Sequence, residues 1–192
     1  MTTGSSAAAE HRQIAGRFGD LVRGADPGSW DSPAPVAGWL ARDVVDHLVT
    51  WLPELLHGGA GITLPRGPAA TSDPVAAWEV HSAAVQALLD DPATPARILS
   101  NPHIGEIPLD RAISQFYTAD VFLHTWDLAR ATGQDDTLDP ERCAETLAGM
   151  EPIEEMLRRS GQYGPRVEVP EDADVQTRLI GFIGRDPEFG RH

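Results

Sequence analysis

The sequence predicts an all-α protein, a four-helix bundle with additional C-terminal helices. Apolar residues recur at helical spacing over long stretches of the 192-residue chain, and segments rich in Pro and Gly separate these stretches. Strand signals are nearly absent, because only residues 166–170 have an extended pattern. The length and the 41% content of hydrophobic residues predict one compact domain over residues 1–192.

The first two predicted helices carry broad apolar stripes. One spans residues 7–23 and ends near Gly24, and the Pro- and Gly-rich residues 25–38 that follow predict a loop. The second helix spans residues 40–56. Pro53 lies inside it, so we expect Pro53 to kink this helix or end it early.

The third and fourth helices have clear boundary signals. The third spans residues 74–89, where Asp73 followed by a Pro at the first helical position predicts an N-cap. A loop rich in Gly and Pro precedes it, and a Pro-rich connection follows it. The fourth helix spans residues 109–131 and is the longest, with Gly133 as a suitable C-cap residue.

Two further helices complete the prediction. A fifth opens at Asp139 and Pro140 and ends near Gly161, and a short last helix spans residues 175–183 and closes at Gly184. Because the loops are long, the sequence determines the all-α fold class better than it determines which helices lie side by side.

Charge and composition exclude several functions. The formal net charge is −14, whereas nucleic-acid binding relies on clustered basic residues. All 15 basic residues are Arg, so neither Schiff-base catalysis by Lys nor a phosphate-binding P-loop is available. Cys143 is the sole cysteine, which excludes an internal disulfide and fits a reducing compartment. No signal peptide or apolar run of roughly 20 residues is found, so we expect a cytoplasmic protein without a membrane partner.

His47 is the first candidate functional residue. It shares a face of the second helix with Val44 and Trp51, so it should point toward the bundle interior. A lone histidine in this position is more often a core residue that makes one hydrogen bond. The same structural interpretation is preferred for His81, and Cys143 is interpreted as a small buried hydrophobe.

The fourth helix adds Asp120 and His124, whose spacing of four residues puts both side chains on one face. Alone, such a pair could be an ordinary surface contact. Burial of a carboxylate is costly unless it is paired or coordinated, and His47 could converge on the same point. Two His and one carboxylate leave a coordination position open, as in catalytic metal sites. Zinc suits this set, with nickel or iron as alternatives.

Asp127 follows His124 by three residues on the same side of the helix. It could accept the second ring N–H of a metal-ligating His124, and it could instead replace Asp120 as a ligand. We prefer Asp120 as the ligand. A plain surface acid is the remaining interpretation of Asp127.

Three segments carry a resemblance to a known family. They are Trp39-Leu-Ala-Arg-Asp-Val-Val-Asp-His47-Leu, Asp120-Val-Phe-Leu-His124-Thr-Trp-Asp127-Leu and Arg178-Leu-Ile-Gly-Phe-Ile-Gly-Arg-Asp-Pro187. In this order they resemble the actinobacterial DinB-like family typified by the metal-binding domain of mycothiol-dependent maleylpyruvate isomerase. The resemblance covers nearly the whole chain.

The resemblance implies a DinB-like four-helix bundle with one metal held by His47, Asp120 and His124. The enzyme's acid is a Glu where this sequence has the shorter Asp120, and relatives have a Thr or Ser helix cap where this sequence has Leu40. The resemblance also implies a low-molecular-weight thiol, such as mycothiol, as co-substrate. A metal deprotonates a coordinating thiol, which could then attack an electrophile in an S-transferase or isomerase reaction.

Three functional hypotheses follow. The first is a metal-dependent transferase or isomerase whose partners are a small-molecule thiol and an electrophile. The second is a non-catalytic metal- or small-molecule-binding protein in stress response or regulation. The third is a structural helical domain in which the two histidines and Asp120 form a buried polar network. A homodimer through a bundle face is compatible with all three, although no pattern specifies one.

Overall fold

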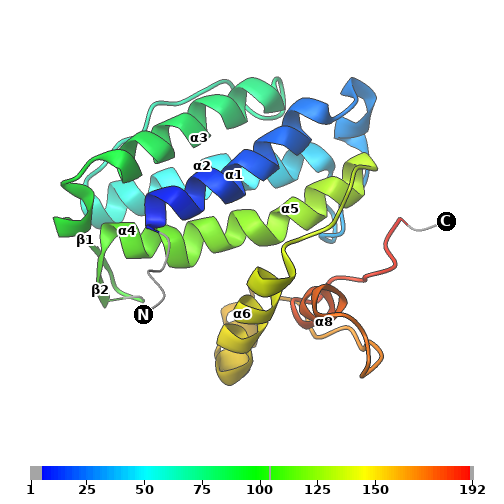
Figure 1. Cartoon of the computed structure of the whole chain (residues 1–192). Helices are drawn as coiled ribbons and strands as arrows, with labels where there is room; N and C mark the ends of the chain where they lie inside the picture. The colour runs from blue at the N-terminus through cyan, green and yellow to red at the C-terminus, as the bar shows by residue number, and fades with distance from the viewer. Residues whose placement is uncertain (1–5, 104, 191–192) are drawn as a thin grey trace.

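Four long helical stretches form the body of the molecule. The structure is a computed structural model and describes residues 6–103 and 105–190. α1 packs against both α3 and α5, and α2 packs against the same two helices, so the four enclose one core (Figure 1). The stretches are α1 (Ala7–Gly24), α2 (Ala41–Ala60), α3 (Pro74–Asp90) and, in continuous sequence, α4 (Leu109–Ala112), η3 (Ile113–Thr118) and α5 (Ala119–Thr132). The mostly helical fold that the sequence predicts is confirmed.

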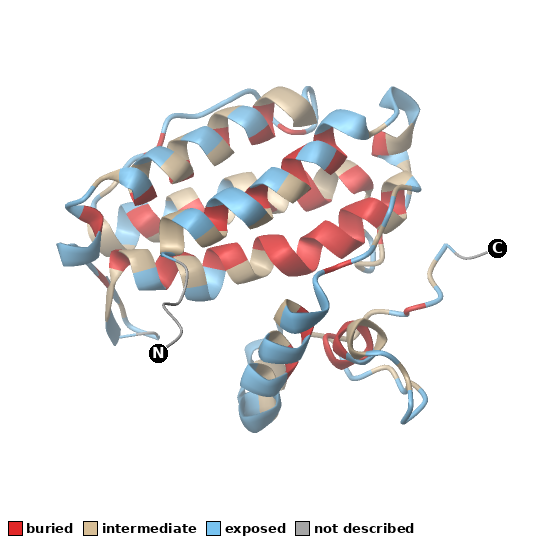
Figure 2. Cartoon of the chain, viewed as in Figure 1, coloured by how far each residue is buried: buried red, intermediate tan, exposed pale blue. Residues whose placement is uncertain are grey.

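Helix periodicity determines which faces form this core. On α2 the residues Val44, Leu48 and Leu52 recur every four positions and are almost completely buried. In α5 every residue from Val121 to Ala129 is buried, so this helix has almost no solvent-facing side (Figure 2). A helix buried all round needs neighbours on every side, and α5 has them in the bundle and in the C-terminal helices.

The predicted capping signals are present. The Asp73 carboxylate accepts a hydrogen bond from the backbone N–H of Ala76 at 2.9 Å, and Gly133 ends α5 in the left-handed region at φ 69°. Leu40 offers no side-chain cap for α2. Asp43 compensates, because its carboxylate accepts a hydrogen bond from the Leu40 N–H at 2.8 Å.

The expectation for Pro53 was wrong in one respect. α2 does not end early, but continues past Pro53 to Ala60 and closes at Gly61, whose φ is 65°. The helix therefore includes the first residues of the Gly-rich segment that the sequence assigned to a loop. Packing of Leu52 and Leu56 into the core outweighs the backbone hydrogen bond that Pro53 cannot make.

The sequence also missed a short β-hairpin. The Pro-rich connection after α3 contains a 3-10 turn, η2 (Thr94–Ala96), and two antiparallel strands, β1 (Ile98–Asn101) and β2 (Gly105–Pro108). Ile98 pairs with Pro108, and the buried Leu99 attaches the hairpin to the core. Residues 166–170, which were expected to be extended, form no strand.

The C-terminal part folds as shorter pieces than predicted. The fifth helix is divided into α6 (Pro140–Met150), a 3-10 turn η4 (Glu151–Ile153) and α7 (Glu154–Ser160), and it ends at Gly161 as expected. α8 (Val175–Phe182) packs against α6 (Figure 1). Their buried residues form a second apolar cluster with Phe122, Leu123 and Trp126 of α5. Whether residues 1–192 behave as one domain stays a prediction.

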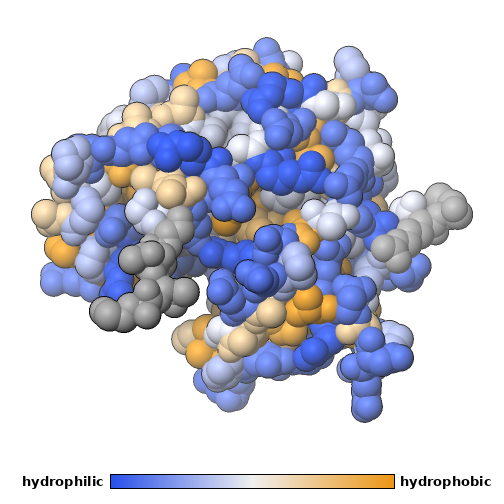
Figure 3. All heavy atoms as spheres, in the orientation of Figure 1, coloured by the Kyte–Doolittle hydropathy of each residue, from blue (hydrophilic) through white to orange (hydrophobic). Residues whose placement is uncertain are grey.

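The face of the molecule drawn in Figure 3 is mostly hydrophilic. Apolar residues lie in small patches between the hydrophilic ones. No helix in the described part of the chain is both long and apolar enough to cross a membrane.

Candidate metal centre

The structure brings together the three residues that the sequence proposed as metal ligands. His47 comes from α2, whereas Asp120 and His124 come from successive turns of α5. Each offers one ligand atom, and these atoms all lie within 4.8 Å of one another. Packing of α2 against α5 creates this convergence, because 73 residues separate His47 from Asp120 in the chain.

Each imidazole approaches a different oxygen of the Asp120 carboxylate. His47 Nε2 lies 3.1 Å from Asp120 Oδ2, and His124 Nε2 lies 3.5 Å from Asp120 Oδ1. The two imidazole rings meet edge to face, with their centroids 5.0 Å apart. The two Nε2 atoms and the carboxylate thus form a compact set of donors.

The charges at this centre stabilise one another. Burial opposes ionisation of Asp120, but the neighbouring His124 and His47 and the Trp51 N–H outweigh it, so the pKa of Asp120 lies below its ordinary value. Burial likewise lowers the pKa of His124, but the carboxylates of Asp120 and Asp127 outweigh it and raise that pKa above 6.5. Asp120 is therefore ionised at neutral pH, and a proton competes with a metal for His124.

Two tryptophans contact the centre, and no sequence pattern pointed to a functional role for either. Trp51 Nε1 donates a hydrogen bond to Asp120 Oδ2 at 3.0 Å. The Trp39 ring lies over both imidazoles, 5.1 Å from the ring of His47 and 5.7 Å from that of His124. The spacing of four residues between His47 and Trp51 was a usable signal, because it puts both on one face of α2.

Asp127 holds His124 from behind. His124 Nδ1 lies 2.8 Å from Asp127 Oδ2, and the Asp127 side chain is fully buried. The ionised Asp127 carboxylate accepts a hydrogen bond from the Nδ1–H of His124. In neutral His124 the Nε2 lone pair therefore faces Asp120 and His47. This is the contact that the sequence suggested. It favours Asp120 over Asp127 as the ligand, because Asp127 lies on the far side of the His124 ring.

No sequence pattern identified Arg185 as a neighbour of Asp127. Its Nε donates to Asp127 Oδ1 at 3.1 Å, and its Nη2 donates to Asp127 Oδ2 at 3.3 Å. Burial acts to raise the pKa of Asp127, but the hydrogen bond with His124 and the charge of Arg185 outweigh it and hold that pKa below its ordinary value. Arg185 belongs to the third segment that carries the family resemblance, residues 178–187, but no local pattern linked it to Asp127, which lies 58 positions earlier in the chain.

The other buried histidines and Cys143 do not belong to this group of three ligand residues. His81 is buried, as the structural interpretation expected, and its pKa is lowered to about 4 mainly by burial. Burial raises the pKa of the Cys143 thiol to about 11, which does not suit a nucleophile. His11 and Tyr117 are also fully buried in the bundle core.

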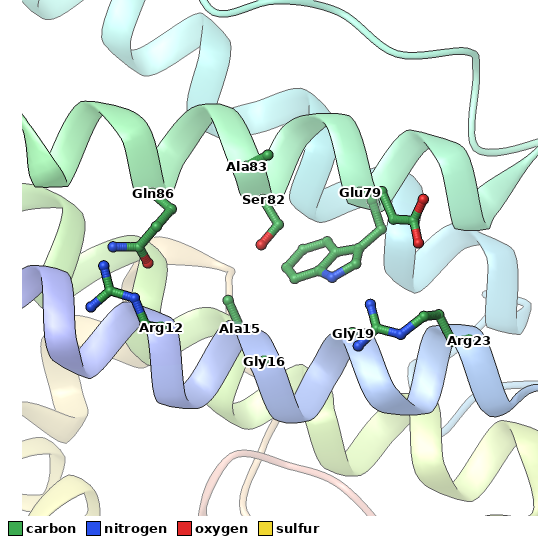
Figure 4. Close-up of a pocket in the computed structure, with 10 residues that line it drawn as sticks. Arg12, Ala15, Gly16, Gly19, Arg23, Glu79, Ser82, Ala83 and Gln86 are labelled. Atoms are coloured by element: carbon green, nitrogen blue, oxygen red, sulfur yellow. The ribbon is translucent and has the colours of Figure 1, made fainter.

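A groove of about 270 Å³ lies elsewhere, between α1 and α3 (Figure 4). Arg12 and Gln86 stand toward one end of it and Arg23 and Glu79 toward the other. The small residues of α1 between them leave this space open. The groove contains none of the proposed metal ligands.

Comparisons with known proteins give distant relatives only. The chain is similar to uncharacterized proteins of Mycobacterium tuberculosis from strains CDC 1551 / Oshkosh and H37Rv. In each case it is 27% identical over 177 residues, which are 91% of this chain and 95% of the relative. No protein-family model matches the chain, and no solved structure matches it.

Proposed function

We propose that this chain binds one divalent metal, most simply zinc, through His47, Asp120 and His124. The observation that carries the proposal is the convergence of the three donors, with His124 oriented by Asp127. Zinc–ligand bonds of about 2.0–2.1 Å in a tetrahedron put neighbouring ligand atoms about 3.3 Å apart. His47 Nε2 lies 3.1 Å from Asp120 Oδ2 and His124 Nε2 lies 3.5 Å from Asp120 Oδ1, so each separation, although to a different carboxylate oxygen, is near that value. Nickel and iron(II) are alternatives, since imidazole and carboxylate also bind them.

We further propose that the site serves a metal-dependent reaction of a low-molecular-weight thiol, as in the DinB-like family that the sequence resembles. Three protein ligands leave one tetrahedral position open. A zinc ion held by these three residues would lower the pKa of a thiol that coordinates it at the open position, which would make the sulfur a nucleophile at neutral pH. Mycothiol is the co-substrate that the resemblance suggests, and an S-transfer or isomerisation is the reaction.

The protein's own residues would perform the supporting steps. Asp120 supplies the negative charge, Trp51 orients its carboxylate, and Asp127 keeps the Nδ1 proton on His124. The Trp39 ring excludes water from one side of both imidazoles. Since a raised pKa means that His124 must lose a proton before it binds a metal, metal uptake should increase as the pH rises through the neutral range.

A non-catalytic role in binding a metal or small molecule is the second candidate. Asp127 and Arg185, the charged residues behind His124, are paired with each other and so are not poised to act on a substrate. The site would then store or sense a metal without turnover.

Elemental analysis of the purified protein is the first test. We expect about one zinc per chain in the wild type and loss of zinc in His47→Ala and His124→Ala. His57→Ala removes an exposed histidine from the same helix as His47 and should retain zinc, which makes it a matched control.

Activity then separates the two candidates. Conjugation of mycothiol to test electrophiles by the wild type, with loss of activity in His124→Ala, supports the thiol-dependent enzyme. Zinc binding without conjugation to any thiol in a panel supports the binding protein. A protein that takes up no zinc, nickel or iron contradicts both and leaves a buried polar network.

A further inference from the structure

Asp127 is a buried charge whose compensation comes from the far end of the chain. Its side chain is 0% exposed, and its described partners are His124 Nδ1 and the Arg185 guanidinium. A buried carboxylate needs partners of opposite charge or hydrogen-bond donors, and Asp127 has them on two sides, in His124 and in Arg185. The orientation of His124 therefore depends on a residue outside the four-helix bundle.

Arg185 reaches Asp127 because α8 ends in a defined turn. Gly184 adopts a left-handed conformation at φ 83°, and the Arg185 N–H donates to the Ile180 carbonyl at 3.0 Å. The Gly184 backbone lies against Gly164, where even a Cβ atom would come within 2.9 Å. This turn directs the Arg185 side chain from the end of α8 toward α5.

Further contacts fix this end of the chain to its surroundings. Arg158 of α7 donates to the Gly164 carbonyl at 2.6 Å and also to the Phe182 carbonyl. Arg130 of α5 donates to the Pro187 carbonyl at 2.7 Å. Residues 139–190, which we call the C-terminal unit, are thereby attached to the same helix that carries Asp120 and His124.

We propose that Arg185 is a positioning residue of the metal centre, so that docking of the C-terminal unit and metal binding strengthen each other. The connection runs from Arg185 to Asp127 and from Asp127 to His124, at distances of 3.1 and 2.8 Å. Coupling between two binding events is reciprocal, so a metal held by His124 must also stabilise the docked C-terminal unit. The inference rests on the proposed metal site and adds what assembles it.

Zinc affinity of substituted proteins tests the first half of the inference. Arg185→Gln removes the charge that holds Asp127, and we expect a roughly 10- to 100-fold weaker zinc affinity, as for loss of other groups that orient a ligand. Arg178→Gln makes the same chemical change at an exposed position of α8 and should bind zinc like the wild type. Competition with a chromophoric chelator measures both.

Arg185→Lys keeps the charge and guards against a folding defect in Arg185→Gln. A lysine cannot make two parallel hydrogen bonds to one carboxylate, so we expect partial rescue, with zinc affinity weakened only several-fold. The visible spectrum of the cobalt(II)-substituted protein should change in Arg185→Gln and return toward the wild type in Arg185→Lys, because His124 changes its orientation. Circular dichroism establishes that each variant is folded.

Hydrogen exchange tests the second half. In the wild type, zinc should slow amide exchange in α8 relative to the chelator-treated protein, and this effect should disappear in Arg185→Gln. A folded Arg185→Gln protein with wild-type zinc affinity, or unchanged α8 exchange on zinc binding, overturns the inference while the metal site stands. Failure of the wild type to bind any metal overturns both.

Discussion

His124 has contacts on both sides that define its chemistry. Its Nε2 faces Asp120 and its Nδ1 meets Asp127, while Trp39 stacks on the ring at an interplanar angle of 18°. With a 6% exposed side chain, the residue can neither rotate freely nor exchange its partners with water. A histidine held in this way presents one nitrogen to a fixed point, which distinguishes a preorganised ligand from a surface residue.

The substitution Asp127→Asn should destabilise the fold even without metal. Asparagine is nearly the same size but leaves the Arg185 charge, in a side chain only 13% exposed, without its counter-ion. Breaking a buried ion pair costs about 3 kcal/mol or more, so we expect a loss of that order in the free energy of unfolding. Urea unfolding in the presence of a chelator measures it. Asp172→Asn, at an exposed position, should change stability by less than about 0.5 kcal/mol. Equal stabilities would show that Asp127 is not ionised.

His81 should make the protein less stable in acid. Its pKa is lowered from 6.5 to about 4 in the folded state, mainly by burial, so below pH 6.5 the unfolded chain binds the proton more readily. This contribution to stability is complete above pH 6.5 and is lost as the pH falls toward 4. Between pH 7.5 and pH 5 the loss is about 2 kcal/mol.

Urea unfolding at the two pH values tests this prediction. His81→Gln should reduce the pH dependence by about 2 kcal/mol, whereas His103→Gln, which removes an exposed histidine, should leave it unchanged. The same pH dependence in all three proteins would mean that another group causes it.

At the scale of elements, α5 connects the two parts of the chain. Asp120, His124 and Asp127 recur along one stripe of this helix, so one backbone sets their relative positions. The π-helical segment η3 comes immediately before α5 and includes Tyr117. An extra residue per turn changes which faces continue along a helix, and such segments are frequent near functional sites.

The turn after α8 is the element that we expect to be least tolerant of substitution. In Gly184→Ala the new Cβ atom would lie 2.9 Å from the Gly164 backbone, at a φ of 83° that alanine rarely adopts. Gly190→Ala also has a positive φ, 71°, but its nearest neighbouring atom is 4.0 Å away. Each should lose about 1 kcal/mol for the backbone conformation.

Gly184→Ala should lose more than that, because the contact with Gly164 must also open. We expect urea unfolding to show a larger loss for Gly184→Ala than for Gly190→Ala, together with weaker zinc binding, since Arg185 follows directly. If the two variants behave alike, the contact between Gly164 and Gly184 contributes little.

At the scale of the whole molecule, two apolar clusters meet at α5, and the proposed metal centre lies beside their junction. One cluster fills the bundle, and the other lies between α5, α6 and α8. Asp120 and Asp127 are on α5, His47 is on the bundle side, and Arg185 is on the side of the C-terminal unit. A metal at this position would be held by the bundle helices and supported, through Asp127, by the C-terminal unit.

Zinc should therefore raise the thermal stability of the whole protein. Zinc at 100 times its dissociation constant stabilises the folded state by about 2.7 kcal/mol, which corresponds to an increase in Tm of about 5–10 °C for a chain of this size. Differential scanning calorimetry measures the increase, and a chelator should reverse it. His124→Ala should show no increase, and neither should the wild type with magnesium, which prefers oxygen ligands. A similar response of His124→Ala would place the zinc elsewhere.

Much of this protein is determined by short-range features of the sequence. The span of α1, the N-cap at Asp73 and the Gly133 cap were predicted correctly, because helix periodicity and capping involve residues within one or two turns. The pairing of Asp120 with His124 on one face follows from the same geometry. The hairpin at residues 98–108 escaped prediction because its strands have only four residues each and contain no clear alternation.

The tertiary structure alone decided which distant residues meet. Packing of α2 on α5 puts His47 beside Asp120, and the turn after α8 puts Arg185 against Asp127. The free energy that selects these neighbours comes from burial of the two apolar clusters as a whole, which no local pattern encodes. The sequence by itself therefore determined the helices and the faces they offer, and the packing of those helices decided that His47, Asp120 and His124 lie together with the pair of Asp127 and Arg185 behind them.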